Sequence, residues 1–248
     1  MAQSPAVSVI IPTYNAARYL ERTVSSVQSQ CFEDWELILA DDASSDGTMD
    51  LARQLAAKDD RIRVLDTKTN GGAARARNRA LKAARGRYMA FLDADDCWRP
   101  EKLTRQVAFM QSTNAPLSYT EFVRHFDDGS ARQVRLPEKV DRKTLLRGNL
   151  IACSTAMYDR EALGLVEMPD VRMRQDFGLW LRILERVPLA HGLCEPLTDY
   201  TVRSDSLSAN KVKAISATWR LFHQVEGFGV VKSTWLLSNV IAGRLKRG

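Results

Sequence analysis

The sequence predicts an α/β fold with a Rossmann-like, mostly parallel central sheet flanked by helices. Short β-branched runs alternate with amphipathic segments over residues 7–92, as in right-handed βαβ units. At 248 residues and 45% hydrophobic content, the chain is long enough to bury the core of one large α/β domain. Polar residues also gather directly after the strands, where ligands bind in open sheets of this kind.

The first half of the chain alternates strand and helix in a regular order. Val7–Ile11 is a β-branched run that ends at Pro12, and Leu20, Val24 and Val27 recur behind it at helical spacing. The same criteria predict strands at 36–40, 62–65 and 88–92 and helices at 48–57 and 73–84. We expect these strands to lie in one parallel sheet.

The second half is predicted to be mixed α+β. A helix at 101–111 precedes two β-rich runs, 117–126 and 131–136, and the Asp127-Asp128-Gly129 turn between these runs predicts a hairpin. Further along, helical spacing of apolar residues predicts a helix that begins near Asp176, followed by a strand at 197–202. The residues at that spacing are Phe177, Trp180, Leu181 and Leu184.

Residues 211–248 form a basic tail. They hold seven Lys or Arg and one acid, Glu226, a formal charge of +6 that equals that of the whole chain, so residues 1–210 are formally neutral. This distribution argues against a nucleic-acid partner. A predicted amphipathic helix in the tail suits an anionic membrane surface and, equally, packing against the chain's own domain or a second subunit. Its apolar face holds Val212, Ile215, Trp219 and Phe222.

No feature of the sequence predicts export or a membrane span. The N-terminus lacks a basic and then apolar leader, and the longest charge-free stretch of the tail, 233–243, is much too short to span a bilayer. The four cysteines lie far apart without a C-x-x-C pair, which indicates a reducing compartment. We therefore expect a cytoplasmic protein, with contact to the inner face of the membrane as an open possibility.

Three carboxylates follow the predicted strand 88–92 within four residues, as Asp93-Ala94-Asp95-Asp96. Their mutual repulsion is costly unless a cation lies among them, and carboxylates prefer hard cations such as Mg²⁺ or Mn²⁺, which bridge phosphate oxygens. A surface turn whose acids only cap the next helix is the alternative. The pattern favours a divalent-metal site over this alternative.

A second acidic turn, Asp41-Asp42, follows the strand 36–40. Ser45 or Asp46 can cap the N-terminus of the next helix, and a cap needs only one such residue. Capping therefore does not account for the adjacent acids Asp41 and Asp42. A carboxylate at this position suits the N–H of a nucleotide base or ribose hydroxyls.

A glycine pair, Gly71-Gly72, opens the helix at 73–84, which carries Arg75 and Arg77 in its first turns. The flexible backbone, the helix N-terminus and the arginines are each suited to a diphosphate. An ordinary glycine loop with solvated arginines is the equally compatible alternative.

Four sequence blocks in a fixed order resemble the family 2 glycosyltransferases of GT-A fold. The resemblance covers residues 6–205 and implies an inverting, metal-dependent transfer of a sugar from a nucleotide diphosphate, commonly UDP, to an acceptor hydroxyl. The blocks are Val7-Ser-Val-Ile-Ile-Pro-Thr-Tyr-Asn15, Asp41-Asp-Ala-Ser-Ser-Asp-Gly-Thr48, Gly71-Gly-Ala-Ala-Arg-Ala-Arg-Asn78 and Phe91-Leu-Asp-Ala-Asp-Asp96.

The resemblance also implies roles for the matching donor-site residues. Thr13 and Asp42 contact the nucleotide base, and Asp93 holds the ribose. Asp95 ligates Mn²⁺ or Mg²⁺ on the diphosphate, and Arg75 or Arg77 adds positive charge there.

By the same resemblance, the general base comes from Met173-Arg-Gln-Asp-Phe-Gly-Leu-Trp180. Asp176 is the predicted base, although Gln175 replaces the acid that more usually precedes it. The segment from Tyr200 to Ser208 resembles one found in transferases of bacterial capsule, teichuronic-acid and exopolysaccharide synthesis. Arg203 within it is expected on the diphosphate or the acceptor, with a surface ion pair as the alternative.

These expectations divide the chain into a nucleotide-sugar half (1–97), an acceptor and base half (98–208) and a helical tail (209–248). The acceptor is expected to be a saccharide or lipid-linked saccharide, and a homo-oligomer stays open. Two other functions remain: a sugar-nucleotide nucleotidyltransferase and a non-catalytic sugar-nucleotide-binding subunit. The nucleotidyltransferase is disfavoured because Pro12-Thr-Tyr-Asn15 stands where it needs a Gly-rich basic loop.

Overall fold

The computed structural model describes residues 4–202 and 211–245. The strands are β1 (Val7–Thr13), β2 (Trp35–Asp41), β3 (Ile62–Leu65), β4 (Tyr88–Phe91), β5 (Cys97–Trp98), β6 (Leu117–His125), β7 (Ala131–Val134), β8 (Lys139–Val140), β9 (Met157–Asp159) and β10 (Ala190–Thr201). The helices are α1 (Ala17–Gln28), α2 (Thr48–Lys58), α3 (Ala73–Ala83), α4 (Lys102–Thr113), α5 (Arg142–Leu145), α6 (Arg160–Leu163), α7 (Gln175–Ile183), α8 (Lys211–Arg220) and α9 (Val230–Leu245). A 3₁₀ turn, η1 (Cys153–Thr155), and a π-helical turn, η2 (Leu221–Val225), complete the described elements.

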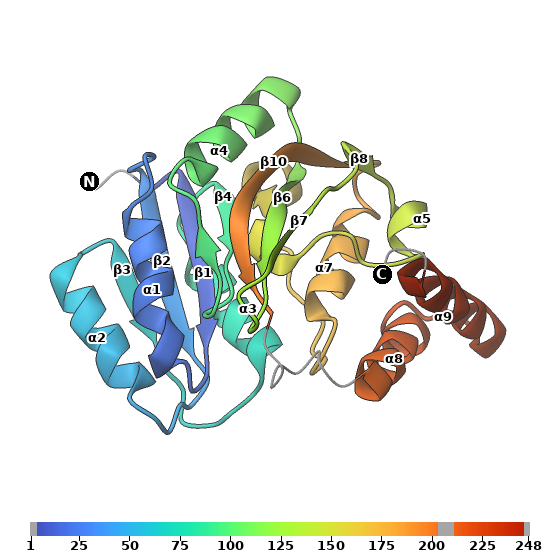
Figure 1. The fold of residues 1–248 in the computed structure, drawn as a ribbon, viewed down its shortest axis with the longest axis horizontal. Coiled ribbons are helices and arrows are strands. Elements are labelled where there is room, and N and C mark those ends of the chain that lie inside the picture. The colour runs from blue at the N-terminus through green and yellow to red at the C-terminus, as the bar shows by residue number, and fades with distance from the viewer. Residues whose placement is uncertain (1–3, 203–210, 246–248) are drawn as a thin grey trace.

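One ten-stranded sheet runs through the described residues (Figure 1). Eight of its strands follow the order β3-β2-β1-β4-β9-β6-β10-β5, and off this path β7 pairs with β6 and β8 with β10. β1 pairs in parallel with β2 and β4, and β2 pairs in parallel with β3. The predicted parallel sheet of the first half is therefore confirmed. Because β9 continues the sheet directly from β4, no break separates the two halves, and their functional division at residue 97 stays a prediction.

Alternate residues of the central strands enter two different cores, as the period of two in a strand requires. On one face, Val9 and Leu37 pack with α1, α2 and α4; on the other, Ile10 and Ile38 pack with α3 and α7. All four side chains are fully buried. Strands covered on both faces explain the continuous apolar runs in the sequence.

The second half is mixed, as predicted. β9 pairs antiparallel with β4 and β6, β10 runs parallel to β6, and β6 and β7 form the expected hairpin with Gly129 at a φ of +82°. The strand predicted at 197–202 begins much earlier, at Ala190. Register shifts on either side of Pro196 break the alternation there, which hid the first part of β10 from the sequence pattern.

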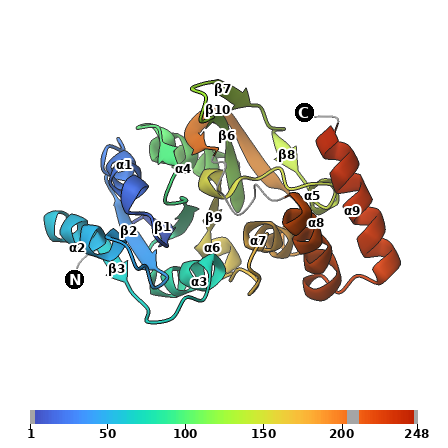
Figure 2. The same cartoon turned by 60° about the horizontal axis from the view of Figure 1, so that its bottom comes forward.

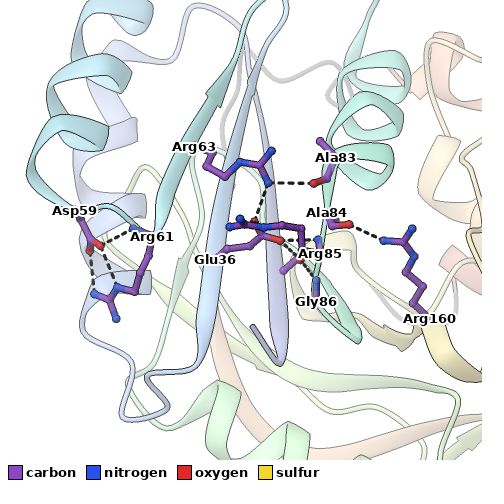
Figure 3. A network of polar contacts seen from close by, with 10 residues as sticks. Glu36, Asp59, Arg61, Arg63, Ala83, Ala84, Arg85, Gly86 and Arg160 are labelled. Atoms are coloured by element: carbon purple, nitrogen blue, oxygen red, sulfur yellow. Dashed lines mark hydrogen bonds and ion pairs between the residues drawn. The ribbon is translucent and has the colours of Figure 1, made fainter. Parts of the chain in front are cut away.

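A buried acid, Glu36, joins β1, β2, β3 and the turn before β4 at the N-terminal edge of the sheet (Figure 3). Ser8 Oγ and the Arg85 backbone N–H donate to Glu36 Oε1 at 2.7 and 2.6 Å. Arg63 Nη1 and Arg85 Nε donate to Oε2 at 2.9 and 3.0 Å. Burial raises the pKa of Glu36, but these donors outweigh it, so its pKa lies below the ordinary value.

The tail packs on the domain through one side of α8 and one side of α9. Leu221, Phe222, Leu236 and Val240 are buried and join the core that contains α7. Figures 1 and 2 both place α8 and α9 at the opposite end of the molecule from α2.

The predicted apolar face of the tail helix is wrong in part, because Val212 is 76% exposed whereas Phe222 is buried. The face assumed a continuous α-helix, but the π-helical turn η2 shifts the helical phase before Phe222. The buried side of α8 instead carries Ala214 and Thr218. Among residues 4–202 and 211–245, no helix has the length and apolar character that a membrane span requires.

Candidate active site

The predicted donor residues lie at the C-terminal edge of the sheet. Thr13 ends β1, Asp41 ends β2, and Asp93 lies two residues beyond the end of β4. Thr13 Oγ1 donates to Asp41 Oδ1 at 3.0 Å, and the backbone N–H of Asp42 donates to the Thr13 carbonyl at 2.9 Å. Parallel pairing thus brings three sequence-distant turns to one edge.

Asp42 fixes the glycine turn before α3. Its Oδ1 and Oδ2 accept hydrogen bonds from the backbone N–H groups of Gly71 and Gly72 at 2.9 and 2.6 Å, and the carboxyl group is buried. Gly72 has a φ of +88°, a conformation that glycine adopts without the penalty of a side chain. Asp42 therefore positions this turn, and its predicted contact with a nucleotide base stays a prediction.

Arg75 and Arg77 point to different places, because residues two apart lie on different sides of a helix. Arg75 is exposed and forms an ion pair with Asp170, Nη2 to Oδ2 at 2.7 Å. Arg77 is buried and its Nη2 pairs with Asp93 Oδ1. The two arginines are thus not arranged as one diphosphate clamp, and Arg77 acts first as the partner that holds Asp93.

The acidic turn is tied to the second half of the chain by Ser154 and Thr201. Ser154 Oγ accepts the Asp93 backbone N–H at 3.1 Å and donates to Asp96 Oδ2. The Thr201 backbone N–H donates to Asp96 Oδ1 at 2.9 Å, and Thr201 Oγ1 donates to the Asp95 carbonyl at 2.6 Å. η1 and β10 therefore fix the backbone of the predicted metal ligand.

The electrostatics of this turn fit a cation. Burial, with the nearby charges of Asp93 and Asp95, raises the pKa of Asp96 well above its ordinary value. Burial is the largest cause of this shift, and the repulsion from Asp93 and Asp95, which adds to it, is the part that a hard divalent cation would relieve.

Within the described ranges, no three His, Cys, Asp or Glu side chains are arranged to hold a metal by themselves. A Mg²⁺-type ion in a nucleotide site commonly takes one or two carboxylates and completes its coordination with phosphates and water. Asp95 is compatible with such a site.

Asp176 lies in the first turn of α7, partly buried and close to the acidic turn. Asn149 Nδ2 donates to its Oδ2 at 3.0 Å. Burial raises the pKa of Asp176; the Phe177 backbone N–H, Arg174 and Arg77 lower it in part, and Asp93 raises it. The shared influence of Arg77 and Asp93 places the predicted base beside the predicted ribose ligand.

Sequence reasoning missed three residues of this neighbourhood. Burial, followed by Asp96, Asp93 and the other site acids, raises the pKa of Tyr200, which places the phenol of β10 among them. Cys153 is buried next to Arg77, and Asn149 contacts Asp176. Tyr200 begins the 200–208 segment, in which only Arg203 was given a role, and Asn149 and Cys153 belong to no motif in this sequence, so only the fold could assign them. Arg203, predicted on the diphosphate or acceptor, lies outside the described residues.

Comparison with known proteins gives the same family throughout. The sequence model of the family Glycosyl transferase family 2 matches residues 8–164. The chain is 40% identical to a Bacillus subtilis (strain 168) protein named for teichuronic acid biosynthesis, the glycosyltransferase TuaG, over 98% of this chain and 97% of that protein. It is 33% identical to the Escherichia coli UDP-Glc:alpha-D-GlcNAc-diphosphoundecaprenol beta-1,3-glucosyltransferase WfgD, over 96% and 93%.

Solved structures share the fold. S. aureus TarS 1-349 in complex with UDP-GlcNAc matches with a TM-score of 0.74 at 20% identity, over 95% of this chain and 71% of that one. The mannosyltransferase PcManGT from Pyrobaculum calidifontis, in complex with GDP-Man and Mn²⁺, matches with a TM-score of 0.71 at 20% identity, over 97% and 74%. The expected GT-A fold is therefore confirmed.

Proposed function

The chain belongs to glycosyl transferase family 2, and we propose that it moves a sugar, with inversion, from a UDP-sugar to a hydroxyl of a lipid-linked saccharide in bacterial surface polysaccharide synthesis. The observation that carries the proposal is the meeting of the acidic turn and Asp176 around Arg77. WfgD, similar over nearly its whole length, is named for UDP-Glc and a diphosphoundecaprenol-linked acceptor. That name supports the choice of donor and acceptor class.

The proposed donor-binding residues contact different parts of the nucleotide according to the strand that they follow. Thr13 and Asp42 would face the base, and Asp93, held by Arg77, would bind the ribose. Arg75 would reach the diphosphate after leaving Asp170, an exchange made easy because both side chains of this ion pair are exposed. Arg203 is proposed on the diphosphate or the acceptor.

Asp95 would hold Mn²⁺ or Mg²⁺ together with the donor diphosphate. Such an ion, when bound, supplies a Lewis acid that neutralises charge on the departing nucleoside diphosphate. The Mn²⁺ named in the PcManGT complex and the raised pKa of Asp96 support this assignment.

Asp176 would act as the general base. The acceptor oxygen forms a bond to the anomeric carbon on the face opposite the diphosphate, and the bond from that carbon to the phosphate oxygen breaks. Asp176 takes the hydroxyl proton as the new bond forms, and the electron pair leaves with the nucleoside diphosphate. A raised pKa suits this role, because a base gains proton affinity as long as it stays ionised at the working pH.

A lipid-linked acceptor would bring the enzyme to the inner face of the cell membrane, and the outer side of α9 supports the proposed contact with that surface. Val231 is 84% and Trp235 58% exposed, whereas Leu236 and Val240 on the other side are buried. Lys232, next to Val231 on α9, and Lys213 on α8 are both exposed. Glu226, the one acid of the tail, pairs with Arg142. An apolar face flanked by basic residues matches an anionic lipid surface, whereas two such faces repel each other.

The first test is a thermal-shift screen with UDP, GDP, dTDP and CMP, each with and without Mn²⁺. A ligand that binds the native state alone raises the melting temperature, so we expect a Mn²⁺-dependent rise with UDP. Asp176→Asn is expected to keep that rise but to lose about 10²- to 10⁴-fold in sugar transfer from UDP-glucose or UDP-GlcNAc to a GlcNAc-diphospholipid. UDP binding without transfer by the wild type would support the non-catalytic subunit instead.

Sedimentation with vesicles tests the membrane contact. We expect the protein to bind vesicles rich in anionic phospholipid and not neutral ones, and Trp235→Glu to bind them several-fold less. Thr234→Glu, with a charge at the neighbouring exposed position, shows whether the whole face takes part. Dimerisation that Trp235→Glu abolishes, without vesicle binding, would show that the face binds a second copy.

A further inference from the structure

We propose that Asn149 positions the general base, by holding one carboxylate oxygen of Asp176 and leaving the other for the acceptor hydroxyl. The inference rests on the proposed function only in taking Asp176 as the base. The contact itself joins two segments that lie 27 residues apart in the sequence.

The orientation of the Asn149 amide is fixed at both ends. Its Oδ1 accepts the Ile151 backbone N–H at 3.2 Å, while its Nδ2 donates to Asp176 Oδ2 at 3.0 Å. If the amide were rotated by 180°, its oxygen would face the Asp176 carboxylate and its NH₂ group would face the Ile151 N–H. Only the orientation described satisfies both contacts. Asn149 is therefore a donor toward Asp176.

The segment that carries Asn149 is attached to the base helix at a second point. Trp180 Nε1 donates to the Ile151 carbonyl at 3.1 Å. Trp180 lies one turn after Asp176 on the same side of α7, so the two hydrogen bonds hold residues 149–151 along the helix. Trp180 is fully buried, and its ring meets Phe91 edge-on, at 5.6 Å between ring centroids.

Phe91 is the last residue of β4, two positions before Asp93. Asn149, Asp176 and Trp180 are thereby connected to the strand end that carries the predicted ribose ligand. The location of the base relative to the donor thus depends on packed, buried contacts.

The amide bond also affects the proton affinity of the base. A donor to the ionised carboxylate favours that form, which opposes the effect of burial. The charged and titratable groups around Asp176 are Arg174 at the start of α7, Arg77 on α3, Asp93 after β4, Cys153 in η1 and Tyr200 on β10. Loss of the Asn149 donor is therefore expected to raise the pKa of Asp176 further.

Two variants separate positioning from a merely structural role. Asn149→Asp keeps the shape of the side chain and an oxygen for the Ile151 N–H, but it loses the donor to Asp176. Asn149→Ala removes both contacts. Because Asn149→Asp also places a second carboxylate beside Asp176, Asn149→Ala decides this point. If Asn149 serves only the local turn, Asn149→Ala loses stability but keeps the wild-type pH profile of kcat.

With the UDP-sugar and acceptor of the transfer assay, we expect kcat to fall roughly 10- to 100-fold in both variants. The acidic limb of the kcat profile moves to higher pH, while the Mn²⁺-dependent thermal shift with UDP is retained. A wild-type rate and pH profile for Asn149→Ala would overturn the proposal. A wild type that transfers no sugar would count against the proposed function and not against the contact.

A measurement that does not depend on enzyme activity distinguishes failure of the Asn149 proposal from failure of the proposed function. Carboxyl ¹³C NMR of aspartate-labelled protein, with Asp176 identified by its absence in Asp176→Asn, gives the titration of the base directly. We expect its midpoint at higher pH in Asn149→Ala than in the wild type. An unchanged midpoint would show that the amide does not support the carboxylate.

Discussion

Two buried acids at opposite edges of the same sheet differ in their ion-pair partners, and their pKa values are shifted in opposite directions. Glu36 at the N-terminal edge and Asp96 at the C-terminal edge are each 1% exposed. Glu36 has Arg63 and Arg85 as ion-pair partners, and its pKa is lowered (Figure 3). Across the described part of the chain, Asp96 makes no ion pair, receives hydrogen bonds from Ser154 and Thr201, and has a raised pKa.

We interpret the difference as that between an acid that stabilises the fold and an acid that lies in the proposed donor site. At the N-terminal edge, charges of this chain compensate each other, so the network stabilises the fold without a ligand. At the C-terminal edge, burial and the neighbouring Asp93 and Asp95 disfavour the ionised form of Asp96, and a cation bound there would favour it. Residues at a functional edge are expected to cost stability, and residues at the other edge to supply it.

The largest expected effect comes from Asp95→Asn at the C-terminal edge. Loss of the proposed metal ligand should lower kcat/KM for sugar transfer about a thousandfold, equivalent to about 4 kcal/mol. The free energy of unfolding, measured by urea denaturation, should not fall. Asp60→Asn, the same change at an exposed site, is the control and should leave both quantities unchanged. A large loss of stability in Asp95→Asn would show that the C-terminal edge of the sheet also stabilises the fold, and would contradict the proposed difference between the two edges.

The opposite result is expected for Glu36→Gln. Removing this charge leaves Arg63 and Arg85 without their partner, and because both are partly exposed, the expected loss of unfolding free energy is about 2–3 kcal/mol. The rate of transfer per folded molecule should be unchanged. A loss of activity without a loss of stability would contradict the structural role.

The pH dependence of this loss has a defined sign. The pKa of Glu36 is lowered from its ordinary value of 4.5, so its contribution is complete above that value and disappears as the pH falls through the folded-state pKa. Wild type and Glu36→Gln should therefore converge in stability below pH 4.5. Urea denaturation at pH 3 to 7 tests this.

Gly86→Ala tests how closely the N-terminal edge is packed. A Cβ at Gly86 would lie 2.7 Å from the Ser8 nitrogen and 2.8 Å from the Val7 carbonyl carbon, both backbone atoms that cannot move aside cheaply. We expect a loss of about 1–3 kcal/mol in unfolding free energy. At Gly229 an added Cβ meets nothing within 4 Å, so Gly229→Ala is the matched control and should not lose stability.

Asp176→Asn is expected to change stability less than Glu36→Gln does, and in the opposite direction, as a gain. Because the pKa of Asp176 is raised, the ionised carboxylate costs stability above its ordinary pKa, and a neutral amide removes that cost. We expect about 1 kcal/mol at pH 8, measured by urea denaturation, and convergence with the wild type at pH 3. A loss of stability at pH 8 would show that the carboxylate is structurally required.

The strand and helix pattern of the first half was predictable because it depends on local periodicity. β3 has the predicted bounds, and the other elements up to β4 agree within one or two residues at each end. The start of β10 was missed because register shifts around Pro196 interrupt the alternation. The predicted apolar face of the tail helix was wrong in part because the π-helical turn η2 interrupts the α-helical period. In both cases extra residues changed the phase that a regular period assumes.

The sequence predicted the acids of the proposed site, whose roles stay predictions, but it did not predict the partners of these acids in the fold. Asp42, Asp93, Asp95 and Asp176 stand in recognisable blocks. Arg77 was assigned to a diphosphate, whereas the structure buries it against Asp93, because its direction from α3 depends on the helix's packing on the sheet.

By itself, the sequence determined the order of elements, the family and the acids at the strand ends, since hydrophobic period and turn chemistry act over a few neighbouring residues. Only the tertiary structure decided which charges meet. Asn149 with Asp176, Ser154 with Asp96 and Arg85 with Glu36 lie 27, 58 and 49 residues apart. Sheet order and helix packing bring such groups together, and that proximity decides that Glu36 lies against two arginines, with a lowered pKa, whereas Asp96 lies against two other acids, with a raised one.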